Sequence, residues 1–254
     1  MSFRVKIEQA SKSRNSSIIL SLDFPFERPE NRENLFTKAE RVLDAVHPHI
    51  CALKINHHLV LPLGTFDGVQ KLVKKAHDLG LLAIMDCKVN DIGATNQVIA
   101  EYYYASGFDA LIANPFIGWE EGLKPIFDVA RKHQRGVILL VYMSHKGADE
   151  GYGQTIIDTE GKKTLQYVSF AKKALKLEAD GAVAGATYPE KIREVHEILS
   201  DKVPIYSPGI GAQGGEITAA LKAGARYLIV GRSIAQAENP EKSAREIQAL
   251  AKIE

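Results

Sequence analysis

Short apolar runs alternate with longer amphipathic stretches along almost the whole chain, and this alternation restricts the possible folds more than any other feature. The runs are nearly continuous in apolar character, as parallel strands covered on both faces are. They lie at Ser17–Leu22, Ile50–Ile55, Leu81–Met85, Ala110–Ala113, Val137–Tyr142, Gly181–Ala184, Val203–Tyr206 and Tyr227–Val230. The sequence therefore predicts strands at these positions.

The stretches between the runs place apolar residues three and four positions apart, which predicts helices. Leu35, Ala39, Val42 and Leu43 illustrate the spacing. The helical patterns cover Asn34–Ala45, Phe66–His77, Ala94–Tyr104, Glu120–His133, Thr164–Leu177, Pro189–Leu199, Gly215–Lys222 and Pro240–Ala251.

Strict alternation of strand and helix indicates parallel strands joined by helical crossovers, an α/β architecture. Eight such units in 254 residues fit a closed (β/α)8 TIM barrel. A doubly wound open sheet is the competing fold, but it usually has fewer strands. We therefore predict a single barrel domain over residues 1–254, in which residues 1–16 form a polar N-terminal extension of unassigned role.

Composition excludes several classes of protein. The net charge of +1 gives no global field for nucleic acid, so any affinity for phosphate must be local. Cys51 and Cys87 belong to no C-x-x-C pair, which disfavours a disulfide framework or a zinc site. The first residues lack the apolar core of a signal peptide, and no run approaches the roughly 18 apolar residues of a membrane span. We expect a cytoplasmic protein.

Charged side chains stand at the ends of the first three predicted strands. Asp23 follows the first, Lys54 ends the second, and Asp86, Lys88 and Asp91 follow the third. The carboxyl ends of barrel strands meet at one mouth, where charges are costly to desolvate unless they pair. Asp86 and Lys88 are two apart on an extended segment, so their side chains emerge on the same side. Asp91 can enter its own site or reach across an interface.

A solvated salt-bridge cluster is the alternative interpretation of a lone D-x-K-x-x-D pattern. The additional charges at neighbouring strand ends, Lys54 and Asp23, favour a functional cluster instead.

Two glycine-rich turns, Ser207–Gly215 and Gly231–Ser233, follow the seventh and eighth predicted strands. Many such turns have no ligand, but barrel enzymes frequently bind phosphate with the loops after these two strands. Glycines let backbone N–H groups approach an anion, and Arg232 supplies a permanently charged fork. The placement predicts a phosphate site.

The segment Ser144–Lys163 is the one long loop, and it follows the fifth predicted strand. It is either a surface excursion or a lid over the site, and its position after that strand favours the lid. Ser144 has a hydroxyl suited to a polar heterocycle edge, although a loop serine is commonly only a turn former. His57 and His58 lack metal-ligand spacing, and we interpret them as partly exposed structural residues.

In combination these motifs resemble the orotidine 5′-phosphate decarboxylase family, in its compact archaeal and bacterial form, over roughly Ser17 to Ser233. The matching positions are Asp23, Lys54, the run from Asp86 to Ile92, Thr95, Met143–Ala148, Pro208–Gly215 and Gly231–Arg232. The resemblance implies decarboxylation of orotidine 5′-phosphate to uridine 5′-phosphate, the last step of pyrimidine nucleotide synthesis, without metal or organic cofactor.

Residue roles follow from the same resemblance. Lys88 is expected to protonate C6 of the substrate, Asp86 to lie beside the departing carboxylate, and Lys54 and Asp91 to complete the charge network. The expected substrate-binding residues are Asp23 at the ribose, Ser144 at the pyrimidine, Gln213 between base and phosphate, Gly231 and Arg232 at the phosphate, and Pro208, Ile92 and Thr95. The resemblance further implies a homodimer in which Asp91, Ile92 and Thr95 enter the neighbouring subunit's site.

Two alternatives stay open. A metal-dependent 3-keto-gulonate-phosphate decarboxylase or hexulose-phosphate synthase shares the D-x-K-x-x-D pattern but needs no pyrimidine reader. Ser144, Gln213 and Ile92 favour the orotidine nucleotide over those substrates. A non-catalytic nucleotide-binding barrel would keep Arg232 and the glycines, but it would have no reason to keep the charged cluster.

Overall fold

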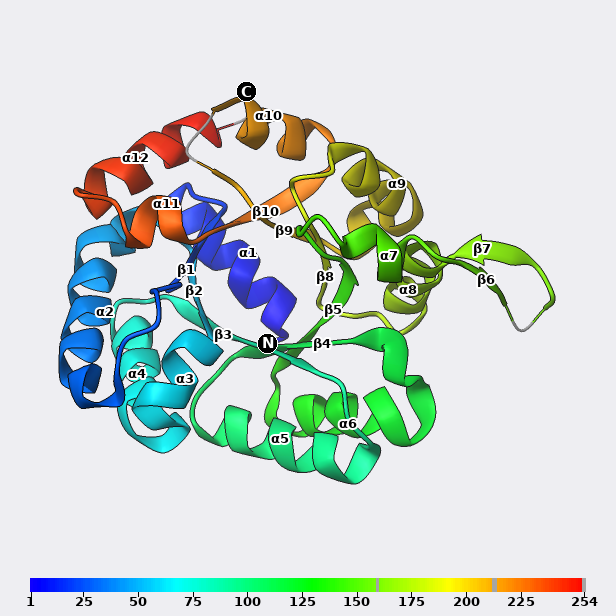
Figure 1. Ribbon diagram of the computed structural model, residues 1–254, viewed down its shortest axis with the longest axis horizontal. Coiled ribbons are helices and arrows are strands. Elements are labelled where there is room, and N and C mark those ends of the chain that lie inside the picture. The colour runs from blue at the N-terminus through cyan, green and yellow to red at the C-terminus, as the bar shows by residue number, and fades with distance from the viewer. Residues whose placement is uncertain (159, 212–213, 253–254) are drawn as a thin grey trace.

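The computed structural model describes residues 1–158, 160–211 and 214–252. Eight parallel strands form a closed barrel in the order β1-β10-β9-β8-β5-β4-β3-β2, and helices surround it (Figure 1). The barrel strands are β1 (Ile18–Ser21), β2 (Ala52–Asn56), β3 (Leu82–Val89), β4 (Ala110–Ala113), β5 (Gly136–Tyr142), β8 (Gly181–Ala184), β9 (Ile205–Pro208) and β10 (Ala225–Val230). The predicted (β/α)8 barrel is confirmed.

The helices outnumber the predicted patterns. They are α1 (Phe3–Arg14), α2 (Arg32–Val46), α3 (His57–Leu63), α4 (Gln70–Asp78), α5 (Gly93–Ala105), α6 (Lys124–His133), α7 (Ala148–Tyr152), α8 (Gln166–Lys176), α9 (Pro189–Leu199), α10 (Gly214–Lys222), α11 (Arg232–Ala235) and α12 (Pro240–Leu250). Sequence analysis missed α1, α3, α7 and α11. No helix of the described part of the chain is long and apolar enough to cross a membrane.

The eight predicted apolar runs all become barrel strands, two of them with the predicted bounds. β3 differs most, because it continues beyond Met85 to Val89 and so contains Asp86 and Lys88. Each strand buries both faces, one toward the barrel interior and one toward the helices. This two-sided burial explains why the runs show no polar alternation.

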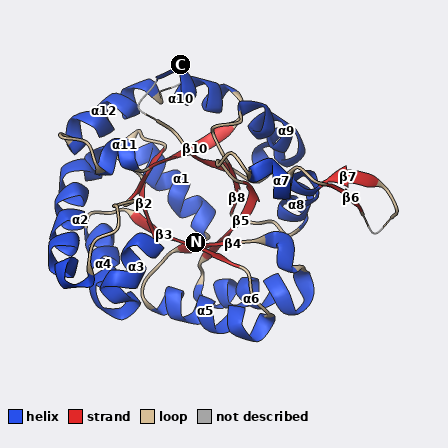
Figure 2. Ribbon diagram, viewed as in Figure 1, coloured by secondary structure: helices blue, strands red, loops and turns tan. Residues whose placement is uncertain are grey.

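Helix α1 lies across the barrel (Figure 2), and its contacts with Gly136 and Ala179 place it at the amino-terminal ends of the strands. Phe3 and Ile7, one turn apart, are 1% and 0% exposed and join the apolar interior of the barrel. Gly136, the first residue of β5, leaves room for Phe3, since a Cβ there would lie 2.6 Å from the ring. Arg4 also donates to the carbonyl of Ala179, at 2.7 Å. The polar extension of the sequence is therefore a plug that closes one end of the barrel.

The segment after β5 is more ordered than the predicted loop. It contains α7 and an antiparallel hairpin of β6 (Thr155–Ile157) and β7 (Lys163–Leu165), and the hairpin projects outward from the ring of helices (Figure 1). The predicted helix from Thr164 was wrong at its start, because Thr164 pairs with Ile156 in the hairpin. The outward direction fits a surface excursion, and a lid role stays a prediction.

The two cysteines, Cys51 and Cys87, are free thiols. Cys51 lies in the barrel interior, where burial raises its pKa to about 12. A thiol with so high a pKa is almost entirely protonated at neutral pH and therefore a poor nucleophile.

Replacing Phe3 with Ala tests the plug. We expect the free energy of unfolding to fall by about 3 kcal/mol, because the change removes a buried aromatic ring and leaves a cavity at the end of the barrel. Urea denaturation followed by circular dichroism measures the loss. Val5→Ala on the same helix is the control, because Val5 is 42% exposed, and equal losses in the two variants would argue against the plug.

Candidate active site

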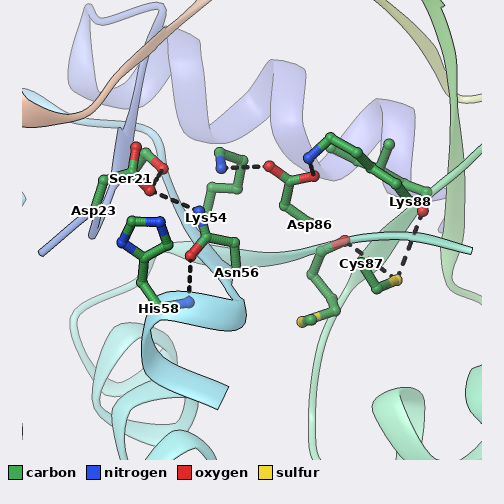
Figure 3. A network of polar contacts seen from close by, with 10 residues as sticks. Ser21, Asp23, Lys54, Asn56, His58, Asp86, Cys87 and Lys88 are labelled. Carbon is green, nitrogen blue, oxygen red and sulfur yellow. Dashed lines mark hydrogen bonds and ion pairs between the residues drawn. The ribbon is translucent and has the colours of Figure 1, made fainter. Parts of the chain in front are cut away.

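A buried carboxylate bridged by two lysines lies at the carboxyl ends of β2 and β3. The Nζ of Lys54 lies 2.6 Å from one oxygen of Asp86, and the Nζ of Lys88 lies 2.6 Å from the other. Lys54 is 4% exposed and Asp86 8% exposed. Figure 3 shows Asp86 between the two ammonium groups. The predicted cluster is thus assembled from three of its four members.

The charges of this cluster compensate for its burial. Burial opposes ionisation of the Asp86 carboxyl, but the positive charges of Lys54 and Lys88 outweigh this effect, and the pKa of Asp86 lies below its usual value. The hydrogen bonds from both lysines act in the same direction. Asp86 is therefore a fixed negative charge, and it holds Lys88 in a defined place.

A bulge in β3 places Lys88. Between Met85 and Val89 the pairing advances four residues on β3 but only two on β4, from Leu111 to Ala113. Lys88 has a φ of 48°, in the left-handed region that non-glycine residues seldom adopt. The sequence predicted that Asp86 and Lys88 meet, on the assumption of a regular strand. They do meet, but through an irregular backbone of the kind that concentrates at functional sites.

Asp23, after β1, forms the neighbouring part of the site. One of its carboxylate oxygens accepts hydrogen bonds from Ser21 Oγ at 2.8 Å and from Asn56 Nδ2 at 2.7 Å. Asn56 also caps α3 by accepting from the His58 N–H. Sequence analysis missed Ser21 and Asn56, although an Asn between an apolar run and a helix is a recognisable cap.

Of the two histidines that the sequence analysis singled out, His58 contacts backbone of a neighbouring segment. His57 and His58 lie on the exposed first turn of α3, and His58 Nδ1 lies 2.5 Å from the carbonyl oxygen of Phe24. Among the described residues, no group of three or more His, Cys, Asp or Glu side chains is placed to hold a metal ion.

Ser144 lies at the mouth, next to the ends of β8 and β9. Its carbonyl accepts a hydrogen bond from Thr187 Oγ1 at 3.0 Å. Gly185 and Gly209 pack directly on it, since a Cβ on either would lie 2.6 Å and 2.9 Å from Ser144 atoms. Tyr142, just before this turn, is 1% exposed and anchors it within a group of aromatic rings.

The predicted phosphate loops lie at the same mouth. Gly231 approaches Asp23 so closely that a Cβ there would lie 2.4 Å from the Asp23 carboxylate, and Arg232 opens α11. Pro208 ends β9, Gly211 lies on the loop that follows it, and the predicted Gln213 is outside the described residues. Sequence analysis missed Glu216, whose carboxylate accepts from the Gly211 N–H at 2.9 Å.

One cavity of about 470 Å³, a volume typical of small-molecule sites, joins the charge cluster, Asp23, Ser144 and the phosphate loops. Charged and polar groups surround its rim, and its floor is the apolar barrel interior. The floor residues are Ile112, Leu140, Val183 and Ile229. The cavity can therefore hold an anionic, partly aromatic ligand with one end near Arg232 and the other near Lys88.

Asp91, Ile92 and Thr95 do not join this cavity. All three are exposed, and the Asp91 carboxylate accepts from the N–H of Ile92 at 2.7 Å. Within one chain the structure therefore leaves the fourth member of the predicted charge cluster outside the site.

Comparison with known proteins gives a consistent match. The model of the orotidine 5′-phosphate decarboxylase / HUMPS family matches residues 16–247. An orotidine 5′-phosphate decarboxylase of Methanosarcina mazei is 36% identical over 236 residues, covering 92% of this chain and 94% of the relative. One of Pyrococcus furiosus is 35% identical over 230 residues, covering 91% and 95%.

Solved structures agree. Orotidine 5′-monophosphate decarboxylase of Methanocaldococcus jannaschii, in complex with the inhibitor BMP, has a TM-score of 0.75 and 32% identity, covering 94% of this chain and 99% of that one. The Pyrococcus horikoshii enzyme has a TM-score of 0.74 and 30% identity, covering 92% and 98%. The Leishmania donovani enzyme, at 22% identity and a TM-score of 0.80, supports the fold alone.

Replacing Lys54 with Met tests the electrostatics of the cluster. The change removes one of the two cations that offset the burial of Asp86, so we expect a loss of about 3 kcal/mol of unfolding free energy at neutral pH. The folded-state pKa of Asp86 lies below its unfolded value, so its stabilising effect is present above the unfolded pKa and is lost as pH falls through the folded pKa. The difference between wild type and variant should therefore shrink toward acid pH.

Urea titrations across this pH range give the measurement. Lys71→Met is the control, because it removes an exposed pair with Asp67 and should change stability little. A Lys54→Met deficit that is independent of pH would contradict the assignment.

Proposed function

The chain belongs to the orotidine 5′-phosphate decarboxylase / HUMPS family, and on that premise we propose that it converts orotidine 5′-phosphate to uridine 5′-phosphate and CO2. This reaction is the final step of pyrimidine nucleotide synthesis. One observation carries the proposal: Asp86 holds Lys88 and Lys54 at 2.6 Å in the same cavity that Arg232 and the glycine-rich loops line.

Lys88 is the proton donor in the proposed reaction. When the bond from C6 to the carboxylate breaks, CO2 departs and its bonding electron pair stays on C6. The Lys88 ammonium group stabilises the developing charge and transfers its proton to C6, and the neutral amine regains a proton from water. A charge held in advance at this position lowers the barrier without reorganisation during the reaction.

Asp86 has two effects in this proposal. It fixes the Lys88 ammonium group, and it places a negative charge beside the substrate carboxylate, so departure of CO2 relieves repulsion between like charges. With Lys54 and a partner's Asp91 added, the array contains two cations and two anions. A net-neutral array of this kind can be buried with each charge compensated.

The rest of the cavity suits the rest of the nucleotide. Asp23, held by Ser21 and Asn56, is the proposed ribose acceptor, and Ser144 reads the pyrimidine edge. Gly231 and Arg232 bind the phosphate together with the loop that begins at Pro208. We assign Gln213 to the contact between base and phosphate on the family resemblance alone. Binding at the remote phosphate can be used to organise the reacting end.

The family name has a second part, HUMPS, and the alternative function is that of the metal-dependent sugar-phosphate enzymes considered above, which use a metal to stabilise an enediolate. The Methanosarcina mazei and Pyrococcus furiosus relatives are orotidine 5′-phosphate decarboxylases. Ser144, clamped at the mouth beside Gly209, further favours a substrate with a polar ring edge over a sugar phosphate.

A spectroscopic assay tests the function. Purified protein mixed with orotidine 5′-phosphate in excess EDTA is expected to produce the absorbance change of conversion to uridine 5′-phosphate. Lys88→Ala should lose nearly all turnover, because no fixed proton donor faces C6, while it still binds uridine 5′-phosphate in calorimetry.

The assay's outcomes separate the alternatives. An unchanged spectrum would refute the decarboxylase proposal, and activity that EDTA abolishes would favour the metal-dependent chemistry. Turnover by Lys88→Ala near the wild-type rate would remove Lys88 from the role of proton donor.

We propose further that the protein is a homodimer through the face formed by α3, residues 64–69 and α5, here called the α3–α5 face. This face exposes Leu61, Phe66, Ile92, Val98 and Tyr102, each by more than half of its surface. Phe66 and Tyr102 stack edge to face at 5.8 Å, and Val98 lies one turn from Tyr102. Clustered exposed apolar side chains typically mark an interface. A partner subunit bound to this face lies close to Asp91. In the proposed dimer, Asp91 therefore enters the active site of the partner subunit.

Tyr102→Glu tests the interface. Sedimentation is expected to show dissociation, because the change buries a charge in an apolar contact, and turnover should fall with it. Ile157→Glu is the matched control, since Ile157 is 70% exposed on the distant hairpin. A Tyr102→Glu protein that sediments as a wild-type dimer would exclude this face.

A further inference from the structure

Asn96, in the first turns of α5, is fully buried, and its side-chain amide bonds only to backbone. Its Oδ1 accepts from the N–H of Asp91 at 3.1 Å, and its Nδ2 donates to the carbonyl of Asp91 at 2.5 Å. The same Nδ2 also donates to the carbonyl of Gly122 at 3.0 Å. Asn96 is 0% exposed. One amide thus forms hydrogen bonds with both backbone polar groups of Asp91 and with the segment 119–123 that follows β4.

Gly93 packs closely against the same segment after β4. A Cβ on Gly93 would lie 2.8 Å from the carbonyl oxygen of Glu121, so this position requires glycine. Glu121 itself has a φ of 50°, in the left-handed region. The turn from Asp91 to Asn96 is therefore held between its own helix and a neighbouring loop.

The Asp91 side chain has no comparable support. It is exposed and accepts a hydrogen bond from the N–H of the next residue. Among the described residues, no cation of the same chain forms an ion pair with it. Its direction is therefore set by its backbone. Asn96 is the group that determines where that backbone lies.

We propose that Asn96 is a positioning residue that aims Asp91 into the active site of the partner subunit. The inference rests on the proposed function, and in particular on the exchange of Asp91 between subunits. Asn96 contacts neither the cavity nor the charge cluster of its own chain, so its effect on turnover is exerted in the neighbouring site.

Asn96→Ala removes all three hydrogen bonds. A displacement of about 1 Å at a reacting group costs on the order of 100-fold in rate, so we expect kcat/KM to fall by about that factor. Asn96→Asp is the second variant, because it keeps the shape and the acceptor for the Asp91 N–H but sets a carboxylate against two carbonyl oxygens.

A loss of activity alone does not distinguish positioning from general damage, and mixed dimers do. Two tagged chains are co-expressed, one with Lys88→Ala and one with Asn96→Ala, and dimers that carry both tags are purified. If Asn96 acts through Asp91, the site with the intact Lys88 receives a correctly placed Asp91 from the other chain. Such dimers should recover about half of the wild-type activity, because one site of the symmetric pair is intact.

The Lys88→Ala/Asp91→Asn dimer is the reference, and it should recover to the same level. Recovery of this reference without recovery of the Asn96 variants would overturn the role of Asn96 and leave the proposed function intact. Wild-type activity in both Asn96 homodimers would overturn it as well. No recovery in the reference would reject the exchange of Asp91 and the inference with it, while the wild-type assay tests the decarboxylase proposal separately.

Asn239→Ala is the matched control for stability. Asn239 caps α12 by accepting from the N–H of Lys242 at 2.9 Å, far from Asp91 in the sequence and outside the cavity. The Asn239→Ala variant should have a lower midpoint of urea denaturation but should not show the loss of kcat/KM that is expected for Asn96→Ala. A loss of kcat/KM in Asn239→Ala equal to that in Asn96→Ala would reduce the effect of Asn96 to stability and overturn the proposal.

Discussion

The ionic bridge from Lys54 through Asp86 to Lys88 is the interaction on which the rest of the site depends. Asp86 is 8% exposed, and two ammonium groups 2.6 Å from its carboxylate favour the ionised form against the effect of burial. Each lysine is in turn held by that carboxylate. The same bridge orders the group proposed to donate the proton and supplies the negative charge proposed to face the substrate.

The barrel makes this bridge possible by bringing β2 and β3 into register, with Asn56 opposite Asp86. A closed barrel needs a filled interior, and α1 fills the end at the amino termini of the strands with Phe3 and Ile7. The end at the carboxyl termini of the strands is open and forms the cavity. One end of the barrel thus supplies stability and the other supplies the site, a division usual for this fold.

The proposed dimer adds the fourth charged residue, Asp91, to the site. The α3–α5 face exposes apolar side chains beside the turn that carries Asp91, and Asn96 fixes that turn from within its own chain. The proposed assembly and the proposed chemistry therefore depend on one short segment between β3 and α5.

The sequence by itself determined the barrel, the charged strand ends and the loops after the last two strands, because apolar periodicity and local turn chemistry are properties of neighbouring residues. Tertiary structure alone decided the bulge at Lys88, the hydrogen bond from Asn56 to Asp23 and the plug formed by α1. Each of these depends on which distant segment packs against which. Phe3 in particular is an unremarkable residue of a polar segment until Gly136, far along the chain, leaves the space that its ring occupies.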